Sequence, residues 1–253
     1  MKFVRFLYQD EPRFALVDGE RVILVEGSPF STYTETEVVE QFRDIQLLPP
    51  CQPTKVVCIG LNYRDHAQEF NLPYPSAPII FIKPTGTVVG PGAPIVYPRL
   101  SKRVDYEGEL AIVIGKKASG VLENEASEYI KGYTCANDVT ARDLQPKEGQ
   151  WTVAKSFDTF CPLGPLVTTE LDTDNAKIET RLNDKVVQKS NIGNLIFKPE
   201  FLVSYISQIM TLYPQDVIIT GTPSGIGPMR DHDVIEVTIE GIGTLSNQVV
   251  VNT

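Results

Sequence analysis

The feature that most constrains the fold of this 253-residue chain is a long series of short β-prone segments separated by Gly and Pro. Beyond residue 55 the series includes VVCIG, PIIFIKP, ELAIVIG, GPLVTT and DVIEVTIEGIG. Runs of this kind, bounded by turn residues, are typical of strands. Helical spacing is clear at 198–210, KPEFLVSYISQIM, and weaker at 123–132. The sequence therefore predicts an α+β fold that is predominantly β, arranged as a barrel or as stacked sheets.

Residues 1–50 have the pattern of a small β-rich unit. KFVRFLY, RFALVD and RVILVEG are short β-prone runs, and VDGER supplies a hairpin turn between the last two. The segment ETEVVEQFRDI at 35–45 is predicted to form a short helix. The segment LLPPCQPTK holds three prolines in nine residues and is typical of a linker. We predict a small N-terminal β-rich domain at 1–50 and a main domain at 51–253.

Composition argues against several classes of partner. The net charge is −9 and the chain has no basic run, whereas nucleic-acid binding requires clustered Lys and Arg. No apolar run approaches the length of a membrane span, and the N-terminus lacks the apolar core of a signal peptide. The four cysteines are scattered and form no C-x-x-C pair, as in proteins of a reducing cytoplasm. We expect a cytoplasmic protein without a nucleic-acid or membrane partner.

Two acidic residues open the buried-looking strand segment VDYEGELAIVIGKK. Glu107 and Glu109 are separated only by Gly108, and residues i and i+2 of a strand point to the same face. Neighbouring carboxylates raise each other's pKa, so the pair requires a cation, a lysine or a retained proton. Hard divalent ions such as Mg²⁺ and Mn²⁺ prefer oxygen ligands. The alternative is a strand end whose acidic side chains face water.

A third acid and a lysine strengthen the case for a site. In GYTCANDVTARDLQ, Asp138 ends another β-like run, and the polar residues Arg142 and Gln145 follow it. Lys155 lies in the largely apolar segment QWTVAKSFDTF. This lysine is either a surface residue that buries its stem or a desolvated cation that balances carboxylates or an enolate.

Two further segments carry groups suited to catalysis or binding. In IGLNYRDHAQEF, His66 and Glu69 share a face if the segment is helical, and a carboxylate beside an imidazole favours a general base. An ordinary surface pair is the alternative. The glycine-rich IITGTPSGIGP lacks the spacing of a Walker or Rossmann loop but offers backbone N–H groups and the Thr222 hydroxyl to an anion, or forms a plain turn. Lys83, in FIKPTG, is similarly ambiguous, and His232 is assigned no role.

Five segments in this order resemble the fumarylacetoacetate hydrolase family: GLNYRDHAQE, FIKP, DYEGELAIVIGK, NDVTARDLQ…AKSFDTFCPLGP and GTPSGIG. The resemblance covers the chain from about residue 56 to its end. Residues 1–50 resemble the β-rich N-terminal extension of bacterial members more weakly. The resemblance implies packed β-sheets around a barrel-like core, usually in a homodimer.

The resemblance also implies a role for each candidate residue. Glu107, Glu109 and Asp138 match the family's carboxylate ligands for Mg²⁺ or Mn²⁺, and Lys155 matches its active-site lysine. Arg142 and Gln145 match polar residues of the substrate pocket. His66 and Glu69 match a pair on a mobile lid that activates water. Thr222 matches a loop residue that holds a substrate carboxylate. An additional aspartate ligand of larger members has no clear counterpart here.

The chemistry that suits these groups is the formation of an enolate from a 2-oxo acid. A 2-oxo acid can chelate a divalent ion, which then stabilises the negative charge that develops. We expect an enzyme that uses this charge to hydrolyse a C–C bond in small 3-acylpyruvates. An oxaloacetate decarboxylase and a 2-hydroxyhepta-2,4-diene-1,7-dioate isomerase of aromatic catabolism are alternatives, because both reactions use the same electron sink. A non-catalytic, metal-stabilised binding protein is a further alternative of a different class.

Overall fold

A mixed β-sheet of 12 strands joins the N-terminal part of the molecule to the rest. The computed structural model of the chain describes residues 1–69 and 71–251, and for residues 37–40 it describes the backbone only. Ten strands of the 12-stranded sheet follow one path, and β5 (Gln46–Leu47) and β8 (Val88–Val89) pair with β1 and β14 beside it. The order along the path is β4 (Tyr33–Gln41), β3 (Arg21–Gly27), β2 (Glu11–Asp18), β1 (Lys2–Tyr8), β14 (Cys161–Thr168), β12 (Ile130–Asn137), β11 (Gly108–Ile114), β17 (Val217–Ile219), β6 (Val56–Gly60) and β7 (Ile79–Lys83).

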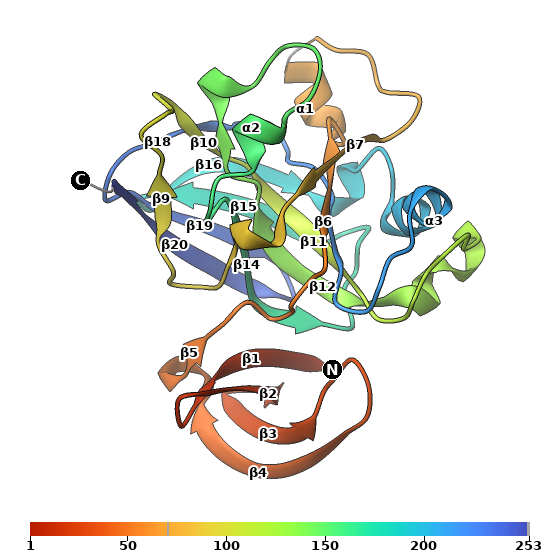
Figure 1. Cartoon of the computed structure of the whole chain (residues 1–253), viewed down its shortest axis with the longest axis vertical. Helices are drawn as coiled ribbons and strands as arrows, with labels where there is room; N and C mark the ends of the chain where they lie inside the picture. The colour runs from red at the N-terminus through yellow and green to blue at the C-terminus, as the bar shows by residue number, and fades with distance from the viewer. Residues whose placement is uncertain (70, 252–253) are drawn as a thin grey trace.

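The first four strands form an antiparallel meander that lies as a separate lobe below the larger body (Figure 1). The predicted hairpin is present, because Asp18 pairs with Arg21 across the turn. The predicted helix at 35–45 is wrong. Strand β4 covers Tyr33–Gln41 and pairs with β3, and only a short 3₁₀ turn, Phe42–Asp44, follows. Pairing with a neighbouring strand has overridden a weak local preference for helix.

The N-terminal lobe is joined to the main sheet by backbone hydrogen bonding. Strand β1 runs antiparallel to β14, with Lys2 opposite Thr168 and Phe3 opposite Val167. The linker predicted at 47–55 then leads into β6, which lies beside β17 in the main body. The division into domains at residue 50 stays a prediction, since the two parts share one sheet.

A second, five-stranded sheet packs against the first. Its order is β16 (Lys185–Asn191), β15 (Lys177–Leu182), β19 (Val234–Ile239), β20 (Gly243–Val251) and β9 (Ile95–Tyr97). Leu110 and Ile112 of β11 share a core with Ile178 and Val237 of this sheet. The layers approach closely at Gly108, where a Cβ would lie 2.2 Å from the Thr180 hydroxyl. Gly108 is therefore required at the point where the two glutamates enter the core.

A small sheet and a few helices complete the structure. Three short strands pair in the order β13 (Thr140–Ala141), β10 (Val104–Tyr106) and β18 (Gly227–Met229). The predicted helix at 198–210 is present as α3 (Pro199–Ile209), whose Leu202, Val203 and Ile206 are buried. The weaker one at 123–132 is a 3₁₀ helix, Glu123–Tyr129, that ends where β12 begins. The predicted fold class, predominantly β with few helices in packed sheets, is confirmed.

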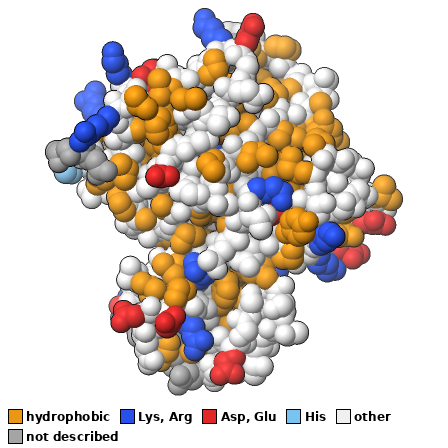
Figure 2. All heavy atoms as spheres, in the orientation of Figure 1, with side chains coloured by type: hydrophobic (Ala, Val, Ile, Leu, Met, Phe, Trp, Pro, Cys, Tyr) orange, Lys and Arg blue, Asp and Glu red, His pale blue; other side chains and the backbone are white. Residues whose placement is uncertain are grey.

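The surface agrees with the acidic composition. On the face drawn in Figure 2, Lys and Arg lie in small separate groups among apolar and acidic side chains, and no continuous basic surface crosses that face. Among the helices of residues 1–69 and 71–251, none is both long enough and apolar enough to span a bilayer.

Candidate active site

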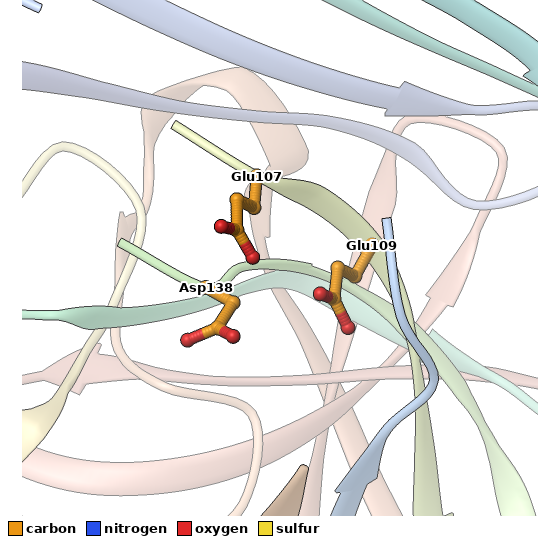
Figure 3. Close-up of side chains that lie close together, drawn as sticks. All are labelled: Glu107, Glu109 and Asp138. Atoms are coloured by element: carbon orange, nitrogen blue, oxygen red, sulfur yellow. The ribbon is translucent and has the colours of Figure 1, made fainter. Parts of the chain in front are cut away.

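The register of β11 and β12 brings three carboxylates together at one end of the main sheet. Gly108 lies opposite Asn137 and Glu109 opposite Ala136, so Asp138 follows directly beside Glu107. A hydrogen bond of 2.8 Å from Asp138 N to Glu107 O closes this corner. One carboxylate oxygen of each acid lies within 4.8 Å of the others. Figure 3 shows the three side chains converging on one space, and we call Glu107, Glu109 and Asp138 the acid cluster.

Two buried lysines balance part of this negative charge. Lys155, at the end of α2 (Thr152–Lys155), places Nζ 2.9 Å from Glu107 Oε2 and 2.5 Å from Asp138 Oδ2. It is 2% exposed, and Nζ also lies 5.1 Å from the centre of the Phe81 ring. Lys83 is fully buried and forms an ion pair with Asp138 Oδ1. Of the two interpretations of Lys155, the structure therefore supports the desolvated cation.

The cations stabilise the negative charges of the acid cluster to different extents. Burial disfavours ionisation of Glu107, but Lys155 and Arg142 outweigh it and lower the pKa of this carboxyl to about 2. Burial, Asp138 and Glu107 together hold the pKa of Glu109 well above its usual value, although Gly221 N donates a 2.6 Å hydrogen bond to it. Burial also acts against the charge of Lys155, yet Asp138 and Glu107 raise its pKa. Glu109 is thus the acid whose charge is least compensated.

The acid cluster fits a hard divalent cation. Its donors are carboxylate oxygens, the ligand type that Mg²⁺ and Mn²⁺ prefer, and the three side chains are buried. Burial together with Asp138 and Glu107 raises the pKa of Glu109, and a divalent ion at the cluster would favour its ionised form. Glu107, Glu109 and Asp138 could therefore hold such an ion.

Arg142 and Gln145 lie at the edge of the acid cluster. Arg142 begins a 3₁₀ turn, Arg142–Leu144, and is oriented by the buried Asp105, with 2.8 Å between Arg142 Nε and Asp105 Oδ2. Its two terminal nitrogens contact Glu107 and the side-chain oxygen of Gln145. Burial opposes the charge of Arg142, but Glu107 and Asp105 raise its pKa. The guanidinium is therefore a fixed cation at the mouth of the site.

His66 and Glu69 lie on a short helix, α1 (Arg64–Glu69), as the spacing predicts. His66 Nδ1 lies 3.3 Å from Glu69 Oε2, and Gly225 N lies 3.3 Å from each carboxylate oxygen of Glu69. The helix is tethered at its start by Asp65, whose carboxylate accepts hydrogen bonds from His66 N and from the Ser190 hydroxyl. We call residues 62–75 the lid, of which residue 70 lies outside the described part of the chain.

Thr222 follows β17 and is tied into the protein. Its hydroxyl donates to Gly108 O at 3.0 Å and accepts from Gln188 Nε2 at 2.8 Å. The hydroxyl proton therefore points to the backbone of the acid cluster, and a role for Thr222 toward a substrate carboxylate stays a prediction.

One cavity of about 230 Å³ connects these groups. All predicted site residues except Glu69 line this cavity, and Glu69 contacts it through His66. The polar lining consists of His66, Glu107, Glu109, Asp138, Arg142, Gln145, Lys155 and Thr222. The remaining lining is formed by Gly60 and by six larger apolar or aromatic side chains, which we call the apolar wall: Ile59, Leu61, Leu72, Ile79, Phe81 and Trp151. His232, which received no role, is 80% exposed on its side chain and pairs with Asp231 away from the cavity.

Comparison with known proteins agrees with this geometry. Residues 55–250 match the family model described as fumarylacetoacetate (FAA) hydrolase C-terminal, and residues 1–50 match one described as Rv2993c-like, N-terminal. The chain belongs to the fumarylacetoacetate hydrolase family. The resemblance drawn from the sequence motifs is thereby confirmed.

Three similar proteins illustrate the family. Protein Rv2993c of Mycobacterium tuberculosis is 43% identical over 260 residues, which cover 99% of this chain and 98% of that protein. The human mitochondrial protein named oxaloacetate tautomerase FAHD2A is 45% identical over 216 residues, covering 81% of this chain and 69% of that one. The crystal structure of 2-hydroxyhepta-2,4-diene-1,7-dioate isomerase from Mycobacterium marinum is 41% identical, with a TM-score of 0.92, and the match covers 100% of this chain and 99% of that one.

Members of the fumarylacetoacetate hydrolase family are enzymes, and this chain shares their fold over its full length. Sequence reasoning did not assign Lys83 or the apolar wall to the site. A lysine inside the apolar strand segment IIFIK was the available signal for Lys83, because an unpaired ammonium is rarely buried. The apolar wall had no such signal, since its members come from β6 and the residue after it, the lid, β7 and the segment before α2.

Proposed function

We propose that this fumarylacetoacetate hydrolase family member is a metal-dependent hydrolase that cleaves a C–C bond in small 3-acylpyruvates by way of an enolate. The observation that carries the proposal is one small cavity lined by both a buried cluster of three carboxylates and the His66–Glu69 pair. The cluster is suited to a cation that stabilises an enolate, and the pair is suited to a base.

Glu107, Glu109 and Asp138 would hold Mg²⁺ or Mn²⁺, and such an ion supplies a Lewis acid for the carboxylate and keto oxygens of a 2-oxo acid. Lys155 is placed to offset the negative charge that develops on the keto oxygen, because its ammonium already lies among these acids. Arg142 and Gln145 would orient the substrate carboxylate from the edge of the cluster, with the backbone around Thr222 on the other side.

His66 would take a proton from water while Glu69 holds the imidazole and stabilises its positive charge. The water oxygen then bonds to the distal acyl carbonyl carbon of the substrate. The bond between this carbon and the central methylene breaks, and its electron pair forms the enolate of pyruvate. Protonation of the enolate carbon gives pyruvate, and the acyl group leaves as a carboxylic acid.

A second candidate function is a reaction that forms the same stabilised enolate without attack by water. The human relative is named an oxaloacetate tautomerase and the Mycobacterium marinum protein a diene-dioate isomerase. In such reactions, or in the decarboxylation of oxaloacetate, the His66–Glu69 pair would move a proton on substrate carbon or play no part. The expected homodimer and cytoplasmic location also stay predictions.

A substrate panel tests the proposal. The protein is supplied with Mg²⁺ and then with acetylpyruvate, fumarylpyruvate, oxaloacetate or a 2-hydroxydienoate, and ultraviolet absorbance and pyruvate formation are followed. We expect loss of the acylpyruvate enol signal together with stoichiometric pyruvate. Turnover of oxaloacetate or the dienoate alone would contradict hydrolysis and favour the second candidate. Full activity after exhaustive chelation would remove the metal from the mechanism.

A further inference from the structure

We infer, building on the proposed function, that the cavity selects 3-acylpyruvates whose acyl group is uncharged and apolar over those that end in a second carboxylate. The reason is the mixed lining of the cavity. Beside the acid cluster and its cations, six apolar or aromatic side chains complete the lining.

The apolar wall is held in a fixed position. The Trp151 ring lies directly on Gly60, where a Cβ would come within 2.7 Å of Cζ3 and 2.8 Å of Cη2. Phe81 meets the same ring edge to face, with 5.2 Å between centroids and 69° between planes. Because Gly60 and Phe81 lie on the paired strands β6 and β7, the sheet itself sets the position of the indole. An aromatic ring held in this way forms a rigid surface for an apolar group.

The apolar wall also sits at a defined place relative to the reacting atoms. Trp151 is the residue before α2, and Lys155 at the end of that short helix reaches the acid cluster. The Phe81 ring contacts both, since Lys155 Nζ lies over it and Trp151 packs against its edge. A 2-oxo acid whose carboxylate and keto group face the acid cluster therefore extends its other end along Phe81 and Trp151.

Among the described residues that line the cavity, no lysine or arginine is left without a carboxylate partner. The lysine and arginine of the lining, Lys155 and Arg142, are already paired with buried carboxylates. A second carboxylate on the apolar side would give up water without a charged partner, which is costly. A methyl or methylene group there buries apolar surface instead, which is favourable.

Two unreactive 2-oxo acids of equal chain length isolate this preference. 2-Oxohexanoate ends in a methyl group and 2-oxoadipate in a carboxylate. Isothermal titration calorimetry of the protein with Mg²⁺ is expected to show at least about tenfold tighter binding of 2-oxohexanoate, because burial of an unpaired carboxylate is costly. Among reactive compounds, acetylpyruvate should likewise have the higher kcat/KM than fumarylpyruvate.

Matched variants locate the cause. W151A should weaken 2-oxohexanoate binding by about tenfold and leave 2-oxoadipate nearly unchanged, whereas W151F should retain most of the preference. Leu72 is 48% exposed at the cavity, so L72K is tolerated and should reduce or reverse the preference by supplying a cation. Equal or tighter binding of 2-oxoadipate by the unaltered protein would overturn the inference. Unchanged affinities in W151A would also contradict it, because the wall would then play no part.

The two proposals fail in different ways. Preference for 2-oxohexanoate without cleavage of any acylpyruvate would contradict the hydrolase and support the selectivity of the cavity. Cleavage of acylpyruvates with a preference for fumarylpyruvate would support the hydrolase and overturn the selectivity.

Discussion

The acid cluster and the lid face the same cavity, yet the fold holds them in different ways. Glu109 stands on β11, Glu107 directly before it and Asp138 directly after β12, both strands lying inside the main sheet, and the carboxylates are buried among fixed cations. His66 and Glu69 stand on a helix of six residues, a length that is not stable in isolation. The proposed ion ligands are thus set by the sheet, whereas the proposed water-activating pair is carried by a short helix outside the sheet, which Asp65 and Glu69 tether to Ser190 and Gly225. This contrast is typical of sites with a gating element.

The largest expected effect comes from the lid base. His66→Ala should lower kcat for acetylpyruvate by about 10²- to 10⁴-fold, the usual contribution of a general base, and leave Mg²⁺ affinity unchanged. Steady-state kinetics and calorimetric Mg²⁺ titration measure the two quantities. His232→Ala is the matched control and should change neither, since this histidine is exposed and distant from the cavity. Equal losses of activity and metal affinity in His66→Ala would make His66 a ligand or a structural residue and erase the contrast.

A change in the acid cluster should reduce metal affinity, the quantity that a change in the lid leaves unaltered. Glu109→Gln should reduce Mn²⁺ affinity by on the order of 100-fold, because an anionic ligand is lost. The same change should leave the melting temperature of the metal-free protein equal or higher, because the raised pKa of Glu109 means that burial and neighbouring acids disfavour its charge. Calorimetry and thermal unfolding follow both effects. Glu69→Gln is the control and should retain metal affinity, and a comparable loss there would place the lid in the metal site.

A smaller effect tests how firmly the sheet supports the acid cluster. The Asp216 carboxylate precedes β17 and bonds Lys55 Nζ, Tyr213 N and the Thr54 backbone and hydroxyl. Asp216→Asn should lower the free energy of unfolding by about 2 kcal/mol at neutral pH, as for other hydrogen-bonded charges. Urea titration measures this loss, and Asp174→Asn, whose side chain is exposed, should cost little.

The effect of Asp216 should also depend on pH in a defined direction. Burial opposes its ionisation, but Lys55, Tyr213 N and Thr54 outweigh it and lower its pKa in the folded state. Its contribution is therefore complete above the unfolded pKa of about 3.9 and disappears as the pH falls through the folded value. The difference between the unaltered protein and Asp216→Asn should shrink at acid pH. A difference that is constant with pH would contradict this assignment.

The smallest expected effect concerns motion without substrate. Amide hydrogen exchange at Leu72 of the lid, whose side chain is 48% exposed, should be at least about tenfold faster than at the fully buried Ala111 and Ile112 of β11. Hydrogen exchange with mass spectrometry or NMR measures the two segments in one experiment. Equal protection of both would show that the lid is as firmly held as the sheet.

The sequence predicted the carboxylates and Lys155 of the site better than Lys83 and the apolar wall. Glu107 and Glu109 could be placed on one face because strand periodicity is a local property, and ordered motifs linked them to Asp138 and Lys155. Lys83 was left ambiguous, because its ion pair with Asp138 depends on how β7 lies beside the main sheet. In the apolar wall, the position of the Trp151 ring depends on its contact with Gly60. The two residues are far apart in the chain, so the sequence does not indicate this contact.

The fold shows the same division between local and long-range information. The N-terminal hairpin at Gly19 and helix α3 were predictable, since turn chemistry and helical spacing are contained in short segments. The segment at 35–45 was predicted as a helix and is a strand with a short 3₁₀ turn, because pairing with β3 decided its conformation. Strand β16 carries polar side chains at an edge, and its weak pattern gave no prediction, although its Gln188 accepts a hydrogen bond from Gly108 N between the two glutamates.

The most direct test of C–C hydrolysis uses water labelled with oxygen-18. Acetylpyruvate is converted by the protein with Mg²⁺ in this water, and the acetate formed is analysed by mass spectrometry. Attack of water on the acyl carbonyl predicts one labelled oxygen in each acetate, with stoichiometric pyruvate and a strongly reduced rate in His66→Ala. Consumption of acetylpyruvate without acetate, or acetate formed equally fast by His66→Ala, would contradict the assignment of the His66–Glu69 pair to water activation.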